Sequence, residues 1–149
     1  MSIQINAVLV ATDFSENAHQ AVDTAIAIAK TFEARMELVH AFQTPVPIVS
    51  PYEVVVPDGF LEQARDAAAQ NLKAVVEKIS SEGVEVRSHL TEVPAAPAIA
   101  RIAEENDVDL VVMGTRGNTG LKHVLLGSVA ERTIRLAPCS VLTVKPKED

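Results

Sequence analysis

Three glycines and one serine stand at a spacing that can bind a phosphate group. Gly114 and Gly117 follow an apolar run, residues 111–113, and Gly127-Ser128 comes nine residues further on, ahead of an amphipathic segment. Glycine lets backbone N–H groups approach a phosphate closely, and the N-terminus of a helix attracts anions. The pattern G-x2-G-x9-G-S therefore predicts a phosphate-binding loop between a strand and a helix.

Each of these residues also has a purely structural interpretation. Gly114 and Gly117 could be turn residues with positive φ. Ser128 and Glu131 match the S-x-x-E capping box that starts a helix. Gly127 directly precedes that serine and has no side chain, which leaves room for a phosphate to approach. The combination favours a nucleotide over a simple turn.

The glycine pattern differs from two common nucleotide motifs. It lacks the Gly-Lys-Ser/Thr of a Walker A loop, and it is not the G-x-G-x-x-G that follows the first strand of a Rossmann unit. The lysine that P-loop enzymes place against the β- and γ-phosphates is therefore missing. Arg116 either remains a solvated surface side chain or folds over the ligand and supplies that charge. Such a site would bind phosphates but do little to drive hydrolysis.

Apolar runs alternate along the chain with segments of helical periodicity. The runs predict five strands, at residues 7–11, 35–42, 84–91, 110–113 and 140–144. Helical spacing predicts four helices, over about residues 15–32, 58–82, 94–105 and 128–136. Residues 43–57 contain four prolines and are expected to form a loop. Ser15 and Asp58 are expected to be N-caps, and Gly83 suits a C′ position.

This alternation predicts an α/β fold with an open five-stranded parallel sheet and helices on both faces. Strand order 3-2-1-4-5 would bring the ends of the first and fourth strands together at a switch point, where such sheets bind ligands. Asp13 and Gly114 would then share one crevice. The last strand, residues 140–144, would lie at an edge and could pair with its copy in a second chain to form a homodimer.

The composition indicates a single globular domain over residues 1–149, since 48% of the residues are hydrophobic and 22% are charged. A net charge of −7 without any basic run argues against nucleic-acid binding. The single cysteine, Cys139, suits a reducing compartment. No signal sequence is present, and no apolar stretch approaches the roughly 20 residues of a membrane helix, so we expect a cytoplasmic protein with no membrane insertion.

Few other residues suggest chemistry. The four histidines, His19, His40, His89 and His123, share no metal-ligand spacing. Asp107 and Asp109 are expected in a solvated turn. No catalytic residue is assigned, and no metal is expected to be held by side chains.

Several segments resemble the universal stress protein family, in the family's order and over essentially the whole chain. They are Val-Leu-Val-Ala-Thr-Asp-Phe-Ser (8–15), Glu-Leu-Val-His-Ala (37–41), Val-Met-Gly-Thr-Arg-Gly-Asn-Thr-Gly-Leu (112–121), Leu-Leu-Gly-Ser-Val-Ala (125–130) and Ala-Pro-Cys-Ser-Val-Leu-Thr-Val-Lys (137–145). The G-x2-G-x9-G-S spacing is the signature of the family's ATP-binding branch. The resemblance implies a Rossmann-like domain of the adenine nucleotide alpha hydrolase-like type, acting as a homodimeric, ATP-binding regulator with a further protein partner that is unknown.

The resemblance also implies where a nucleotide would bind. One group of residues would line the adenine and ribose end: Ala11, Thr12, Asp13, Ala41, Met113 and Gly114. A second group would hold the phosphates through backbone N–H groups and the serine hydroxyl, with Mg²⁺ or Mn²⁺ bridging phosphate oxygens: Gly117, Gly127, Ser128 and Val129. The Asp13 carboxylate could accept hydrogen bonds from ribose hydroxyls.

Three functions are compatible with these residues. The first is a non-enzymatic module that holds ATP and signals through nucleotide-dependent shape or partner choice. The second is a slow ATPase or phosphotransferase, against which stands the lack of a general base near the expected γ-phosphate. The third is binding of AMP or cyclic AMP. Ala11 stands where the family often has proline and Ala41 where it has a larger aliphatic residue, so the resemblance implies that both would enlarge or loosen the base pocket.

Overall fold

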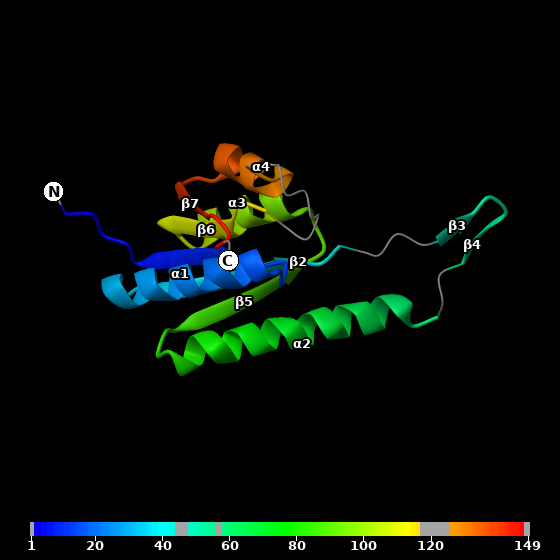
Figure 1. Ribbon diagram of the computed structural model, residues 1–149, viewed down its shortest axis with the longest axis horizontal. Helices are drawn as coiled ribbons and strands as arrows, with labels where there is room; N and C mark the ends of the chain where they lie inside the picture. The colour runs from blue at the N-terminus through cyan, green and yellow to red at the C-terminus, as the bar shows by residue number, and fades with distance from the viewer. Residues whose placement is uncertain (1, 44–47, 56–57, 117–125, 148–149) are drawn as a thin grey trace.

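The computed structural model describes residues 2–43, 48–55, 58–116 and 126–147. Its main sheet has five parallel strands: β1 (Ala7–Ala11), β2 (Arg35–Ala41), β5 (Val86–Thr91), β6 (Leu110–Gly114) and β7 (Ser140–Val144). Their order is β5-β2-β1-β6-β7 (Figure 1), which confirms the predicted order 3-2-1-4-5. The central strand β1 is flanked on both sides, and residues 7–10 are fully buried.

Two core clusters lie on opposite faces of this sheet. On one face α1 (Glu16–Phe32) and α2 (Phe60–Ser81) pack against apolar side chains such as Val8 and Leu38. On the other face α3 (Ala95–Glu105) packs against Leu9 and Val39. The short helix α4 (Ser128–Leu136) packs against α3 and β7. Alternation along each strand sends successive side chains to the two faces. None of the described helices is both long and apolar enough to cross a membrane.

The helix ends agree with the sequence in part. Ser15 is the N-cap of α1, and its side chain accepts the Ala18 N–H at 3.2 Å, as predicted. Gly83 follows the end of α2 with φ +82°, which confirms its C′ role. The prediction of Asp58 as an N-cap is wrong. Gly59 takes that position with φ +80°, because a left-handed turn at this glycine delays the start of α2 by one residue.

The prediction that residues 43–57 are only a loop is also wrong. Strands β3 (Ile48–Ser50) and β4 (Glu53–Val55) form an antiparallel hairpin that projects from the body of the molecule (Figure 1). Isoleucine and valine favour extended structure, and Pro51 suits the second position of the turn that joins the strands. Prolines 45, 47 and 57 lie outside the described residues.

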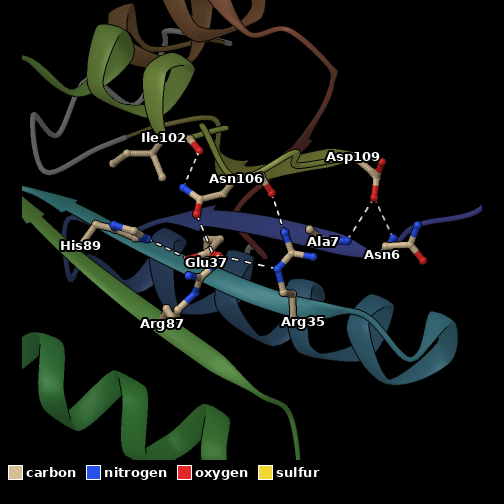
Figure 2. Close-up of polar contacts among 9 residues, drawn as sticks. All are labelled: Asn6, Ala7, Arg35, Glu37, Arg87, His89, Ile102, Asn106 and Asp109. Carbon is tan, nitrogen blue, oxygen red and sulfur yellow. Dashed lines mark hydrogen bonds and ion pairs between the residues drawn. The ribbon is translucent and has the colours of Figure 1, made fainter. Parts of the chain in front are cut away.

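A buried carboxylate links β2 and β5. The side chain of Glu37 is fully buried and pairs with Arg87 Nη2 at 2.6 Å and with His89 Nε2 at 2.8 Å (Figure 2). Arg87 also donates to Asn106 Oδ1 at the end of α3, and Arg35 donates to the Asn106 carbonyl. Because α3 carries no basic residue in its last turn, these arginines supply the positive charge that a helix C-terminus favours.

A second carboxylate holds the start of β1. Asp109 Oδ2 accepts the N–H groups of Asn6 at 2.7 Å and Ala7 at 3.1 Å (Figure 2). The expectation of a solvated turn is confirmed for Asp107, which is exposed in a turn, and is wrong for Asp109. Its carboxylate satisfies backbone donors at the beginning of the central strand, where β6 runs alongside β1.

Candidate functional site

A cleft of ≈ 360 Å³ lies at the carboxyl ends of β1, β2 and β6. Ten of the residues proposed to bind a nucleotide line it together: Ala11, Thr12, Asp13, Ala41, Met113, Gly114, Arg116, Gly127, Ser128 and Val129. The eleventh, Gly117, lies outside the described residues. Segments more than 100 positions apart in the sequence therefore meet at one end of the sheet.

Further lining residues were not identified from the sequence: Ala18, Val39, His40, Gln43, Ala95, Ile99, Thr115 and Ala130. His40 and Gln43 flank the predicted Ala41 at the end of β2, so their proximity in sequence was an available signal. Ala95 and Ile99 belong to α3, and only the packing of that helix against the sheet brings them to the cleft. Nothing in their local sequence marks them.

The loop after β1 is shaped by its own side chains. Thr12 Oγ1 accepts the Phe14 N–H at 3.0 Å, and Asp13 Oδ1 accepts the Ser15 N–H at 3.0 Å. These two short turns let Phe14 adopt a φ of +64°, which is unusual for a bulky residue. They carry the chain from β1 directly into α1 and place the Asp13 side chain in the cleft lining.

His40 holds this loop from the neighbouring strand. Its Nδ1 lies 2.8 Å from the Thr12 carbonyl oxygen, and its ring lies 4.3 Å from the Phe14 ring, centroid to centroid. Because a carbonyl only accepts hydrogen bonds, Nδ1 must carry the proton. The histidine therefore fixes the backbone at the carboxyl end of β1.

Gly114 ends β6 for a steric reason. A Cβ atom at this position would lie 2.6 Å from Asn17 Oδ1 and 2.8 Å from Asn17 Cγ. The backbone of Gly114 does not have positive φ, so the turn interpretation of this residue is wrong. The glycine instead allows α1 to pack directly against the start of the loop that follows β6.

The start of α4 differs from the predicted capping box. Gly127, not Ser128, is the N-cap, and no side chain caps the helix. Ser128 is already the first helical residue, one position too late for its hydroxyl to cap the helix. The Gly127 N–H is donated to Thr115 O at 2.6 Å, and a Cβ at Gly127 would lie 3.1 Å from that oxygen. Close contact with the β6 loop accounts for the glycine.

The N-terminus of α4, the positive end of the helix dipole, faces the cleft. The first N–H groups of α4, at residues 128–130, have no acceptor within the helix. All three residues line the cleft. Among the described lining residues the charged side chains are Asp13 and Arg116. Across the part of the chain that the structure describes, no three His, Cys, Asp or Glu side chains are grouped to hold a metal ion.

The cleft occupies the switch point of the sheet, because the chain turns to β2 on one side of β1 and to β6 on the other. The fold and the site thus define an open, Rossmann-like α/β protein with a ligand cleft at the carboxyl ends of its strands. The model of the universal stress protein family matches residues 4–145. The chain belongs to the universal stress protein family.

Two curated relatives agree with this assignment. The chain is 36% identical over 147 residues to the universal stress protein MJ0531 of Methanocaldococcus jannaschii, covering 95% of this chain and 84% of the relative. It is 32% identical over 146 residues to the universal stress protein YxiE of Bacillus subtilis, covering 94% of this chain and 99% of the relative.

Solved structures share the whole fold. The protein MJ0577 superposes with a TM-score of 0.84 at 27% identity, covering 99% of this chain and 100% of its own. A universal stress protein family member from Burkholderia pseudomallei superposes with a TM-score of 0.73 at 27% identity, with the same coverage. This chain therefore shares its arrangement of sheet and helices with both structures.

Proposed function

We propose that the cleft binds an adenine nucleotide, with ATP and Mg²⁺ or Mn²⁺ as the ligand. We further propose that the protein works as a nucleotide-dependent regulator in the stress response. The observation that carries the proposal is the position of α4, whose N-terminus has no side-chain cap and faces the cleft formed by the ends of β1, β2 and β6. A helix N-terminus with unpaired N–H groups favours a phosphate.

The phosphate end of the ligand would lie at α4. Backbone N–H groups of Ser128 and Val129 and the Ser128 hydroxyl would donate to phosphate oxygens, while the Gly127 N–H remains bonded to Thr115. Arg116 would add positive charge from the β6 loop. The cation would neutralise phosphate charge and be held by the phosphates, since the described side chains form no cluster of ligands.

The adenine and ribose would lie at the other end. Ala11, Ala41, Met113 and Ile99 offer a mostly aliphatic lining for the flat base. Asp13 would accept hydrogen bonds from the ribose hydroxyls. A volume of ≈ 360 Å³ lies at the lower end of the usual range for small-molecule sites, about 300–1,000 Å³, and suits a ligand of mononucleotide size.

A second candidate ligand is an adenosine monophosphate. One solved universal stress protein, 23% identical to this chain with a TM-score of 0.66, is a complex with cAMP. Another, from Archaeoglobus fulgidus, 24% identical with a TM-score of 0.65, is a complex with dAMP. At this identity the likeness supports a shared fold, and those ligands belong to those proteins. They make AMP and cAMP the natural competitors in a binding experiment.

Little in the cleft suits rapid hydrolysis. The chain has no Walker lysine, and the described cleft residues that could accept a proton, Asp13 and His40, lie at the ends of β1 and β2, where the ribose is proposed to bind. In the proposed arrangement neither lies beside the γ-phosphate, where a general base for water would be needed. We therefore propose a module that retains its nucleotide and signals through it.

The test begins with ligand identity. Nucleotide is released by acid from freshly purified protein and identified by chromatography and mass spectrometry. Titration calorimetry then compares ATP, AMP and cAMP, with and without Mg²⁺. We expect ATP in the extract and tighter binding of ATP with the cation. Replacing Gly127 by valine should weaken ATP binding at least about tenfold, because the new side chain would push α4 away from Thr115 O.

A matched control separates binding from folding. Ala27→Val adds a branched side chain on the exposed side of α1 and should leave affinity unchanged. A wild-type protein that carries no nucleotide and binds none would overturn the proposal. Preference for AMP or cAMP over ATP would favour the second candidate. Multiple turnover of ATP at the rates usual for enzymes would favour a hydrolase instead.

A further inference from the structure

We infer that Asn17 is a positioning residue of the cleft and couples residues 115–116, which follow β6, to the edge strand β7. The inference rests on the proposed nucleotide site and concerns how that site is regulated. Asn17 lies in the first turn of α1 and is 7% exposed. It does not itself line the cleft, so it acts through the residues that do.

The Asn17 amide joins two segments far from it in the sequence. Its Oδ1 accepts the Arg116 N–H at 3.1 Å, and its Nδ2 donates to Val144 O at 3.0 Å. The acceptor oxygen must face the N–H group and the donor nitrogen must face the carbonyl, so only one orientation of the amide satisfies both. A single side chain thus holds the loop after β6 and the last residue of β7.

Gly114 makes this contact possible. The space that a Cβ at Gly114 would take is filled by the Asn17 side chain, 2.6 Å from Oδ1 and 2.8 Å from Cγ. The Asn17 amide therefore packs directly against the backbone at the end of β6. A shift of the Gly114–Arg116 backbone toward a bound phosphate must move this amide or break its hydrogen bonds, because close-packed groups have no free space to absorb it.

The end of β7 receives the same support from neighbouring groups. Val144 O also accepts the Thr115 N–H at 3.2 Å. Gln20 Oε1 lies 3.5 Å from Asn17 Nδ2 and accepts the Lys147 N–H at 3.2 Å. A nucleotide contact at Arg116 would thus be connected to the segment that leaves the edge of the sheet, through the Asn17 amide and, beside it, through the Thr115–Val144 backbone bond.

Three variants separate the two functions of the amide. Asn17→Asp retains an acceptor for Arg116 but puts an oxygen against Val144 O. Asn17→Ala removes both bonds. Gly114→Ala inserts the clashing Cβ. Asn71→Ala, on the exposed side of α2, is the matched control. Nucleotide affinity is measured by calorimetry, thermal stability by calorimetric melting, and amide exchange at Thr115, Arg116 and Lys147 by NMR with and without ATP and Mg²⁺.

We expect nucleotide to slow exchange at all three amides in the wild type. Asn17→Ala should weaken binding about tenfold, the effect expected if the unsupported residues 115–116 take up their binding conformation about one tenth of the time, and should reduce the response at Lys147. Asn17→Asp should keep the response at Arg116 and reduce it at Lys147. Gly114→Ala should weaken binding in the wild type but have little further effect in Asn17→Ala, because the clash partner is gone.

The outcomes distinguish the two proposals. A wild type that binds no nucleotide overturns the proposed function, and the coupling with it. A wild type that binds, with Asn17 variants of unchanged affinity and unchanged exchange response, overturns the coupling alone. Equal loss of thermal stability and of affinity in all variants, with the Lys147 response retained, shows a merely structural asparagine and also overturns it. If Asn17→Ala fails to fold, Asn17→Asp decides through its exchange pattern.

Discussion

Gly114 and Gly127 are glycines because neighbouring atoms come too close for a side chain. Neither needs the left-handed backbone that glycine usually provides, since Gly127 has φ −71° and Gly114 is absent from the positive-φ region. Asn17 fills the space at the first, and Thr115 O lies against the second. Their positions in the sequence correctly predicted the end of β6 and the start of α4. The reason for each glycine lies in atoms contributed by other segments.

Cys139 provides a prediction at the residue scale. Burial raises the pKa of its thiol, with a smaller contribution from the negative charge of Asp109. The folded protein therefore favours the neutral thiol. The stability from this preference is present below the pKa of the unfolded thiol and is lost as pH rises through the folded pKa. Alkylation by iodoacetamide followed against pH should show a midpoint in the native protein above that in urea. Coinciding midpoints would contradict the assignment.

Helix capping shows how far local sequence reaches at the element scale. Ser15 caps α1 as its sequence predicts, but Asp58 and Ser128 do not cap α2 and α4. In both failures a glycine next to the expected cap takes the position instead. Residue type indicates that a helix starts nearby, whereas the path of the preceding chain decides which residue becomes the N-cap.

Glu37 provides a prediction about the β2–β5 pair. Its fully buried carboxylate is bonded to Arg87 and His89, so Glu37→Ala leaves both side chains without this acceptor. Because Arg87 remains half-exposed and keeps its bond to Asn106, the cost is that of leaving hydrogen-bond donors unsatisfied, typically about 1–3 kcal/mol of unfolding free energy. Urea denaturation should show a loss of this size.

The control is the exposed pair Lys30–Glu82, whose side chains are 52% and 49% exposed. Lys30→Ala should change the unfolding free energy by less than about 1 kcal/mol, because solvent screens the pair. Similar losses for both variants would show that Glu37 contributes no more than a surface ion pair.

The free edge of the sheet matters at the scale of the whole molecule. β7 ends the strand order, and Leu142 on it is 39% exposed. We predict a homodimer through antiparallel pairing of β7 with its copy. Val141 is unsuited to a test, because it packs against the core beneath α3 and a charge there would disturb folding. Leu142→Asp should lower the mass in solution toward that of a monomer, as measured by sedimentation equilibrium.

Phe32→Asp is the matched control for the dimer. Phe32 is 42% exposed but lies at the far end of α1, away from β7. Its replacement should leave the mass unchanged. A wild type that sediments as a monomer at micromolar concentration, or a Leu142→Asp variant of unchanged mass, would contradict pairing through this edge.

The sequence by itself determined the succession of the five main strands and four helices and their parallel pairing, and it predicted the strand order that the structure confirms. Periodicity and apolar runs are local properties, and parallel strands with helical crossovers leave few topologies. Ligand clefts in open parallel sheets lie at the carboxyl ends of the strands. Asp13 and Gly114 meet in one cleft because they lie at the carboxyl ends of the adjacent strands β1 and β6.

Only the tertiary structure decided which side chains and backbone groups form hydrogen bonds and ion pairs with each other. Asn17 meets Arg116 and Val144 across 99 and 127 positions, and Glu37 meets Arg87 across 50. The hairpin of β3 and β4 was not predicted, because the prolines in residues 43–57 indicated a loop. Such pairings depend on how helices pack onto the sheet, which brings side chains within hydrogen-bonding distance regardless of their separation along the chain. The sequence therefore predicted that Gly114 and Gly127 lie near Asp13, but it did not predict that Asn17 contacts the residues after β6.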